Sequence, residues 1–254
     1  MLNTLKKFIS RHIVFPTAKL PLRTSLQERV FIVTGASRGI GRAIVEVLAS
    51  RGAMVVAVAR HPERGQTEDS LRATAAIHIV SGDVTSESDV QSIVEQTVKT
   101  FGRIDGVVNN AGVNIFKPLE MTSLAEFTET VDVNVKGAFL FSKHAIPEMK
   151  KRKAGLILNI GSKISHNTQV GANKSVYALT KYALEGFSFA LNRELKPFGI
   201  RVSCLMPGTV NTFVSLNGSD YLSPYQVAEM VATIAEMDGI DFESILFKAR
   251  QQAL

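Results

Sequence analysis

The chain has 254 residues, of which 45% are hydrophobic and 20% charged, a composition that predicts a globular protein with a sizeable buried core. Its apolar runs, such as residues 53–59, are far shorter than the roughly 20 residues of a membrane-spanning helix, so no transmembrane segment is expected. A single cysteine, Cys204, excludes an internal disulfide and a cysteine-built metal site, and it suits a reducing compartment. The five histidines show no metal-ligand spacing, and we therefore expect no bound metal.

The formal charge of +6 is concentrated at the N-terminus. Residues 1–27 carry five basic residues and no acidic one, which leaves 24 basic and 23 acidic residues, a net +1, for the body. So small an excess does not indicate a nucleic-acid partner. The apolar side chains of the segment share one helical face: Leu2, Leu5, Phe8, Ile9 and Ile13. Basic side chains lie on another face: Lys6, Lys7 and Arg11.

Residues 1–28 are therefore interpreted as a basic amphipathic N-terminal extension. Its role stays open between an arm that packs on the body or remains loose, a mitochondrial targeting peptide, and a segment that makes peripheral membrane contact through residues 1–27. The expected location is accordingly cytoplasmic, with a mitochondrial one as the alternative.

From Arg29 onward, short apolar segments alternate with longer amphipathic ones: RVFIVT, GRAIVEVLASRG, AMVVAVA, IHIVSGDV, SESDVQSIVEQTVKTFG and IDGVVNNAG. This alternation predicts parallel strands joined by crossover helices, and strands that are apolar throughout are typical of a sheet covered on both faces. Gly52 is placed to end the first helix. Ser86 with Asp89 resembles a capping box that begins a helix over residues 87–101.

The second half continues this pattern without a linker or an internal repeat. We expect a long helix over residues 124–151, a strand over 155–162, a helix over 175–198, a strand over 200–206, a helix over 224–237 and a last strand near 243–252. The sequence thus predicts the α/β class. It would form a single doubly wound Rossmann-type domain over residues 29–254, with a central parallel sheet of about seven strands flanked by helices.

The first strand runs into TGASRGIG, a turn with glycines at positions 35, 39 and 41, and then into a helix. Glycine permits a tight turn and a close approach of the backbone to a pyrophosphate, and the free amides and dipole of a helix N-terminus favour that anion. Because the turn lies between a strand and a helix of the first βαβ unit, it predicts a dinucleotide site.

The end of the second strand bears on the choice of nicotinamide dinucleotide. A carboxylate there would bind the ribose 2′-hydroxyl, whereas arginine accommodates a 2′-phosphate. The chain has Arg60 at this point, the first acid after it is Glu63, and Arg38 in the glycine turn can reach the same phosphate. The prediction is therefore NADP(H). Asp83, after the third strand, is a candidate for the adenine amino group or for the cap of the next turn.

The spacing Gly-x-x-x-Gly-x-Gly resembles that of the short-chain dehydrogenase/reductase family. Further motifs follow in that family's order: NNAG at 109–112, NVKG with Asn134, NIGS ending at Ser162, YALTK at 177–181 and PGTVNT at 207–212. The resemblance covers nearly the whole body. It implies an NADP(H)-dependent oxidoreductase that interconverts a carbonyl and a secondary alcohol of a small-molecule substrate by hydride transfer.

The resemblance also implies roles for single residues. Tyr177 would be the general acid/base, and Lys181 would hold the nicotinamide ribose hydroxyls. Ser162 would orient the substrate oxygen, and Asn134 would keep a water-linked proton path in place. The cofactor contacts would come from Gly35, Ser37, Arg38, Gly39, Ile40, Gly41, Arg60, Asp83, Val84, Asn109, Ala111, Gly112, Tyr177, Lys181, Pro207, Gly208, Val210 and Thr212.

Residue chemistry agrees with the roles of the tyrosine and the lysine. A tyrosine hydroxyl has an unperturbed pKa near 10, and a nearby cation favours the phenolate. On a helix, residues four apart share a face, so Lys181 is expected beside Tyr177.

The chain departs from the family pattern in three places, two of them on the substrate side. The 15-residue step from Ser162 to Tyr177 is longer than in typical members, with Ser165 as a weaker alternative to Ser162. The segment 213–223 must serve as a short substrate lid. The chain also lacks the Gly-Gly-bearing final strand of many tetrameric members, although a homo-oligomer is still expected. The alternatives are a 3-oxoacyl-thioester (acyl-carrier-protein) reductase of fatty-acid synthesis and a non-catalytic nucleotide-sensing binding protein.

Overall fold

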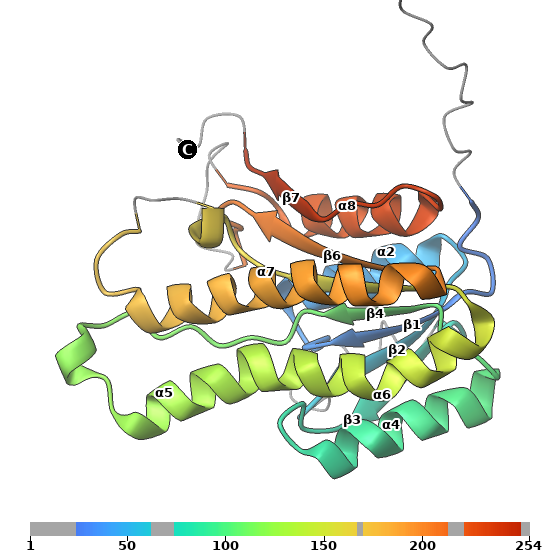
Figure 1. Cartoon of the computed structure of the whole chain (residues 1–254), viewed down its shortest axis with the longest axis horizontal. Coiled ribbons are helices and arrows are strands. Elements are labelled where there is room, and N and C mark those ends of the chain that lie inside the picture. The colour runs from blue at the N-terminus through green and yellow to red at the C-terminus, as the bar shows by residue number, and fades with distance from the viewer. Residues whose placement is uncertain (1–23, 62–73, 167–169, 213–220, 250–254) are drawn as a thin grey trace, which may run out of the picture.

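The centre of the molecule is a sheet of seven parallel strands, as the alternation of apolar and amphipathic segments predicts (Figure 1). The strands are β1 (Val30–Thr34), β2 (Met54–Ala59), β3 (Ile77–Ser81), β4 (Gly106–Asn109), β5 (Gly155–Ile160), β6 (Ile200–Pro207) and β7 (Ser244–Phe247). Their order across the sheet is β3-β2-β1-β4-β5-β6-β7, and each neighbouring pair is parallel. The computed structural model describes residues 24–61, 74–166, 170–212 and 221–249.

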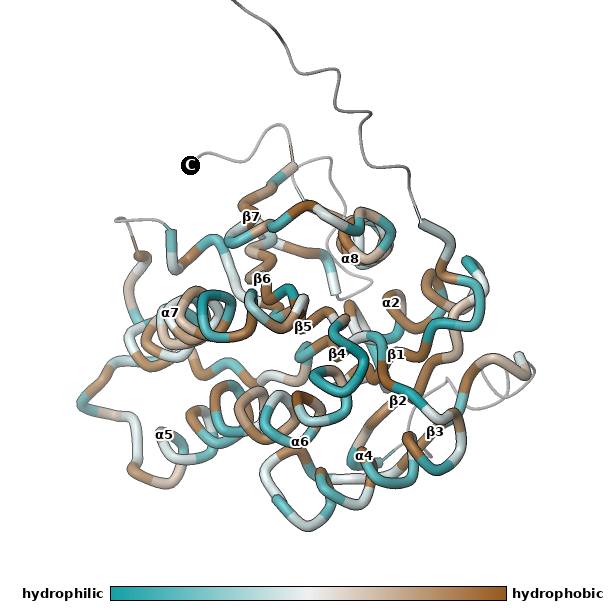
Figure 2. The backbone as a smooth tube through the Cα atoms, turned by 45° about the vertical axis from the view of Figure 1, so that its right-hand side comes forward, coloured by the Kyte–Doolittle hydropathy of each residue, from teal (hydrophilic) through white to brown (hydrophobic). Residues whose placement is uncertain are grey.

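Helices cover both faces of the sheet, so the strands are buried on each side. The helices are α2 (Gly39–Ser50), α4 (Glu87–Phe101), α5 (Leu124–Val131), α6 (Gly137–Arg152), α7 (Ser175–Leu195) and α8 (Pro224–Glu236). Helices α2 and α8 pack together on one face, and α4, α6 and α7 lie on the other (Figure 1). Alternate residues of β1 enter the two cores: Phe31 and Val33 join the first, and Ile32 joins the second. Figure 2 shows hydrophobic residues through the strands between these layers.

The strand order reverses between β1 and β4, which are neighbours although they are not consecutive in the chain. From this point the crossovers run in opposite directions, so the segments leaving the carboxyl ends of β1 and β4 diverge and leave a crevice. In open α/β sheets, ligands bind at such a switch point. The glycine turn follows β1 and the NNAG motif follows β4, which places both predicted motifs at the crevice.

Two helices differ from their predicted extents by more than one residue, whereas α8 ends at Glu236, one residue before its predicted end. The predicted long helix over 124–151 is interrupted by a π-helical turn, Asp132–Lys136, which contains buried Asn134. Helix α7 ends at Leu195 and not at 198, because Pro197 cannot donate a backbone hydrogen bond and instead occupies a 3₁₀ turn, Lys196–Phe198. Helix α4 has the predicted bounds, and the Ser86 side chain accepts a hydrogen bond from the Asp89 amide at its start.

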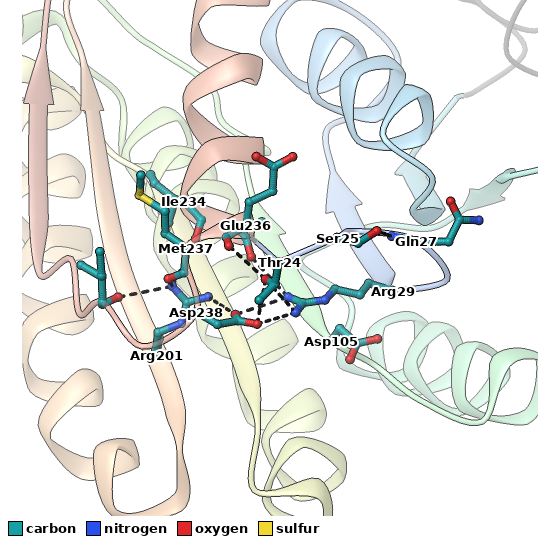
Figure 3. A network of polar contacts seen from close by, with 12 residues as sticks. Thr24, Ser25, Gln27, Arg29, Asp105, Arg201, Ile234, Glu236, Met237 and Asp238 are labelled. Atoms are coloured by element: carbon teal, nitrogen blue, oxygen red, sulfur yellow. Dashed lines mark hydrogen bonds and ion pairs between the residues drawn. The ribbon is translucent and has the colours of Figure 1, made fainter. Parts of the chain in front are cut away.

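The first described residues are fixed to the far side of the domain from the crevice. Leu26 is 1% exposed in the core beside α2 and α8. The Thr24 amide donates to the Glu236 carbonyl at 2.7 Å, where α8 ends, and Arg29 and Arg201 both contact Asp238 (Figure 3). Residues 1–23 lie outside the described part of the chain. None of the described helices is long and apolar enough to cross a membrane.

Candidate active site

Each glycine of the turn after β1 meets a different steric demand. Gly35 has a φ of +66°, and a Cβ there would lie 2.8 Å from the Ala111 Cα. A Cβ on Gly41 would lie 2.2 Å from the Gly35 carbonyl oxygen, which no side chain can accommodate. Gly39 has a φ of +57°, and a Cβ added to it would lie 3.4 Å from the Thr212 methyl group. The glycine turn and the turn after β6 therefore meet across the crevice.

Two residues that the sequence reasoning missed hold this turn to the end of β4. The Thr34 hydroxyl accepts hydrogen bonds from the Asn110 and Ala111 amides, both at 3.0 Å. The Asn110 side-chain amide donates to the carbonyls of Thr34 at 2.9 Å and Gly35 at 3.2 Å. The partners are about 76 residues apart, so only their positions at the ends of two neighbouring strands could have indicated the contact.

The two arginines predicted to select the cofactor are both exposed. Arg38 immediately precedes α2, and Arg60 follows β2. Neither forms an ion pair within the described residues. Arg60 and Asp83 line one surface cavity of about 640 Å³, opposite residues of α5. Asp83 Oδ1 also accepts hydrogen bonds from the Thr85 amide and hydroxyl, both at 2.8 Å. Asp83 therefore caps the turn that follows β3, which is the alternative role predicted for it.

At the other end of the crevice, Tyr177 and Lys181 lie on the first turns of α7. Tyr177 is half-buried and Lys181 is 6% exposed. The Lys181 ammonium donates to the Ile160 carbonyl, at the end of β5, at 2.8 Å, and it lies 5.7 Å from the centroid of the Tyr177 ring. Lys181 is thus a buried cation without an acidic partner among the described residues, held beside a phenol.

A network behind this pair involves Asn134. Its amide nitrogen donates to the Val113 carbonyl at 2.9 Å and to the Thr180 hydroxyl at 3.0 Å, and its oxygen accepts from the Val113 amide at 2.8 Å. The Thr180 hydroxyl in turn donates to the Tyr177 carbonyl at 2.8 Å. Both amide hydrogens of Asn134 are therefore committed to protein partners. Thr180, which is fully buried, was not among the predicted site residues, and its place within YALTK was the only signal.

The two serines after β5 differ in their environment. The Ser162 Oγ accepts a hydrogen bond from the Ile164 amide at 3.3 Å and is half-buried. Its hydroxyl proton has no acceptor among the described residues. Ser165 is 5% exposed, donates to the Ser162 carbonyl at 3.0 Å and lies 3.2 Å from the Met206 sulfur. Ser165 is therefore committed to the core, and Ser162 is the serine that remains able to donate.

Not every predicted residue brings its side chain to the crevice. Asn109 is 5% exposed and donates to the Asn159 side chain at 2.8 Å, within the core between β4, β5 and α6. Gly112 approaches Asn134, whose Oδ1 would lie 3.3 Å from an added Cβ. Val84 packs against Gly137, where an added Cβ would lie 2.9 Å away.

The turn after β6 reaches the crevice through Thr212, which lies close to Gly39. Pro207 ends β6, and the Gly208 amide donates to the Phe247 carbonyl at 2.7 Å. Val210 forms a bridge with Leu222, so the described end of the predicted lid returns to the turn that carries Thr212. Residues 213–220 of that lid lie outside the described part of the chain.

The described residues contain no group of three or more His, Cys, Asp or Glu side chains that could hold a metal ion. Cys204 is fully buried in β6, and burial raises the pKa of its thiol to about 11. It is therefore a packed side chain and has no reactive thiolate at neutral pH.

The parallel sheet, with a glycine turn at its switch point, defines a Rossmann-type α/β protein. Residues 29–220 match the family model described as short chain dehydrogenase. The chain belongs to this family, whose members are oxidoreductases that bind a nicotinamide cofactor and act on small molecules.

Individual relatives agree with the family assignment. A protein of Thermotoga maritima named uncharacterized oxidoreductase is 37% identical over 191 residues, 74% of each chain. One of the same description from Staphylococcus aureus is 32% identical over 212 residues, 82% of this chain and 91% of the relative. The structure of an alcohol dehydrogenase from Thermococcus sibiricus, complexed with 5-hydroxy-NADP, has a TM-score of 0.81 and 28% identity and covers 89% of this chain and 98% of that chain.

Proposed function

We propose that the protein is an NADP(H)-dependent oxidoreductase that interconverts a carbonyl compound and a secondary alcohol, with Tyr177 as general acid/base. The observation that carries this proposal is the buried Lys181 ammonium, which has no acidic partner among the described residues and lies 5.7 Å from the centroid of the Tyr177 ring. A solvated lysine would contribute little to such a site. A buried ammonium fixed beside the ring could instead hold the ribose of a nicotinamide cofactor next to Tyr177, whose hydroxyl would act as the general acid/base.

The crevice fits a dinucleotide. Side chains at Gly35 and Gly41 would collide with the backbone, so the turn can present bare amides to a pyrophosphate at the start of α2. Arg38 immediately precedes α2 and Arg60 follows β2, where both would face the adenosine end of a bound dinucleotide, and neither is paired with an acid in the described chain. Two such guanidinium groups favour the 2′-phosphate of NADP(H). The NADP analogue in the Thermococcus sibiricus structure agrees with this preference.

In the proposed mechanism, bound NADP(H) would give or accept the hydride at the carbonyl carbon. Ser162 would donate a hydrogen bond from its hydroxyl to the substrate oxygen, without giving up its proton, and so hold the carbonyl toward Tyr177. Tyr177 would transfer a proton to that oxygen during reduction and remove it during oxidation. Lys181 would bind the nicotinamide ribose while its charge acts on Tyr177. Asn134 would hold the segment at Val113 and the first turns of α7 together, which fixes the wall of the site.

The test of this proposal is the oxidation of NADPH and of NADH over a panel of ketones, aldehydes and 3-oxoacyl thioesters. We expect kcat/KM with NADPH to exceed that with NADH. Replacing Arg38 and Arg60 together by alanine should reduce this ratio by at least about 100-fold, since a hydrogen bond to a charged group contributes about 1.5–3 kcal/mol and two arginines are removed. The matched control is Arg193→Ala, which removes an exposed arginine of α7 distant from the crevice. It should leave the ratio of kcat/KM with NADPH to that with NADH unchanged.

The outcomes separate the alternatives. Turnover restricted to 3-oxoacyl thioesters would identify the reductase of fatty-acid synthesis. Tight NADPH binding without turnover of any carbonyl compound would identify a nucleotide-sensing protein. A preference for NADH in the unmodified protein would contradict the assignment of Arg38 and Arg60.

A further inference from the structure

The side chains of Tyr177, Phe116 and Lys174 lie next to one another in that order. The rings of Phe116 and Tyr177 meet edge to face, with their centroids 5.5 Å apart. The Lys174 ammonium lies 5.4 Å from the centroid of the Phe116 ring. Tyr177 and the Lys174 ammonium therefore lie on either side of the exposed Phe116 ring.

Phe116 belongs to a segment that is fixed on both sides. Val113 is held by the two hydrogen bonds with Asn134, and Lys117 forms an ion pair with Glu126 at 2.6 Å. Phe116 itself is 53% exposed. An aromatic ring presented by a fixed segment beside a reacting group is suited to packing the apolar body of a ligand.

The Lys174 ammonium has no acidic partner among the described residues. The sequence has no Asp or Glu between positions 149 and 184, and Lys174 forms no ion pair with a described residue. Glu126 is already paired: the hydrogen bond from Lys117, with those from Ser123, lowers its pKa to about 2, so it stays ionised and balances Lys117. The ammonium of Lys174 is thus available to an anionic group of a ligand.

We propose that the substrate is a carbonyl compound with an apolar body and an anionic group, such as an oxo acid. Its body packs on Phe116 and its anion is bound by Lys174. This inference rests on the proposed function, because it takes Tyr177 as the residue that meets the carbonyl. Lys174 is then a residue that determines specificity, since a neutral ketone of the same shape gains nothing from it.

The experiment uses a pair of compounds that differ by one charge, 4-acetylbenzoate and its methyl ester, with NADPH as reductant. The unmodified protein should reduce the acid with a kcat/KM about tenfold above that of the ester, the ratio that 1.4 kcal/mol of added attraction produces. Lys174→Gln should remove this advantage, mainly through KM, and leave the ester unchanged. Lys174→Glu should reverse it. Lys196→Gln, which removes a lysine paired with Asp241 beyond the other end of α7, is the control and should change neither value.

Equal reduction of acid and ester by the unmodified protein, or an equal loss for both in Lys174→Gln, would overturn the inference. If neither compound is turned over, calorimetry on the NADPH complex decides: tighter binding of the acid that disappears in Lys174→Gln supports the inference, and equal or absent binding overturns it. The proposed function is tested separately, by turnover over the wider panel of carbonyl compounds. The proposed function and this inference can therefore fail independently.

Discussion

At the scale of single residues, Thr180 connects two parts of the site. Its hydroxyl accepts from Asn134 and donates to the Tyr177 carbonyl, so one buried oxygen joins the π-helical turn to the first turns of α7. It touches neither the substrate path nor the Tyr177 hydroxyl. Thr180 is therefore a positioning residue, and its effect on turnover must act through Tyr177 and Asn134.

Thr180→Val keeps the shape of the side chain but leaves an Asn134 amide hydrogen without its partner. It also removes the second hydrogen bond to the Tyr177 carbonyl, which keeps its bond within the helix. A buried polar group left unsatisfied costs about 1–3 kcal/mol, so the free energy of unfolding and kcat should both fall, kcat by about tenfold. Thr180→Ser retains the hydroxyl and should restore most of kcat. Urea unfolding and steady-state kinetics well below the melting temperature measure both effects. A valine variant with full kcat, or a serine variant as slow as valine, would contradict this role.

At the scale of elements, the glycine turn depends on close backbone contacts. Gly41→Ala would place a Cβ 2.2 Å from the Gly35 carbonyl oxygen and 2.4 Å from the Asn110 amide nitrogen. Both atoms belong to the hydrogen-bonded corner at Thr34, which cannot move without losing those bonds.

We expect Gly41→Ala to weaken NADPH binding by at least about tenfold and to lower the melting temperature, as measured by fluorescence titration and thermal unfolding. Gly186→Ala is the matched control. It lies inside α7 with no atom within 4 Å of an added Cβ, so alanine should stabilise that helix by roughly 0.5–1 kcal/mol and leave NADPH affinity unchanged. Normal NADPH affinity in Gly41→Ala would show that the turn does not form the cofactor site.

The elements themselves follow closely from the pattern of the sequence. The alternation of short, uniformly apolar segments with amphipathic ones predicted the parallel sheet, and Gly52 and Ser86 marked helix ends where the structure has them. The π-helical turn could not be predicted, because the residues from 124 to 151 keep a helical pattern throughout. The turn coincides with the contacts of Asn134 to Val113 and Thr180, which lie 21 and 46 residues away. Such long-range contacts leave no local signal.

The same distinction applies to the site. The motif residues at the carboxyl ends of β1, β4, β5 and β6 could be placed from sequence, since parallel strands bring their ends to one edge. The supporting contacts could not, because Thr34 meets Asn110 and Lys181 meets Ile160 through the fold alone. The direction of the Asn109 side chain, into the core, also depends on strand pairing with Asn159.

At the scale of the whole molecule, an ionic cluster near the amino-terminal ends of the strands joins the first described residues to the segment after α8 (Figure 3). Arg29 precedes β1, Arg201 lies in β6, and both contact Asp238 after α8, with the Thr24 hydroxyl 2.9 Å from the same carboxylate. Burial alone would raise the pKa of Asp238, but the hydrogen bonds from Arg29 and Thr24 lower it below the ordinary value of 3.8.

Because the folded-state pKa of Asp238 is depressed, its contribution to stability is present above the ordinary value of 3.8 and is lost as the pH falls through the lower folded value. Asp238→Asn should therefore lower the free energy of unfolding at pH 7 by about 1–2 kcal/mol. The effect is no larger because the carboxylate is partly exposed and solvent screens its ion pairs. The difference should persist to about pH 4 and narrow below it. Glu148→Gln, which removes an exposed pair with Lys151, is the control and should change stability by less than about 0.5 kcal/mol. A difference that does not narrow under acid conditions would contradict this role of Asp238.

The proposed chemistry depends on Tyr177 as the proton donor and acceptor of an NADP(H) enzyme. The most direct measurement compares Tyr177→Phe with the unmodified protein in NADPH oxidation with a carbonyl substrate, together with NADPH binding by fluorescence. Since a positioned acid/base group contributes about 10²–10⁴-fold, kcat should fall at least 100-fold while NADPH affinity stays within about twofold. Turnover retained by Tyr177→Phe with unchanged NADPH binding would contradict the central claim.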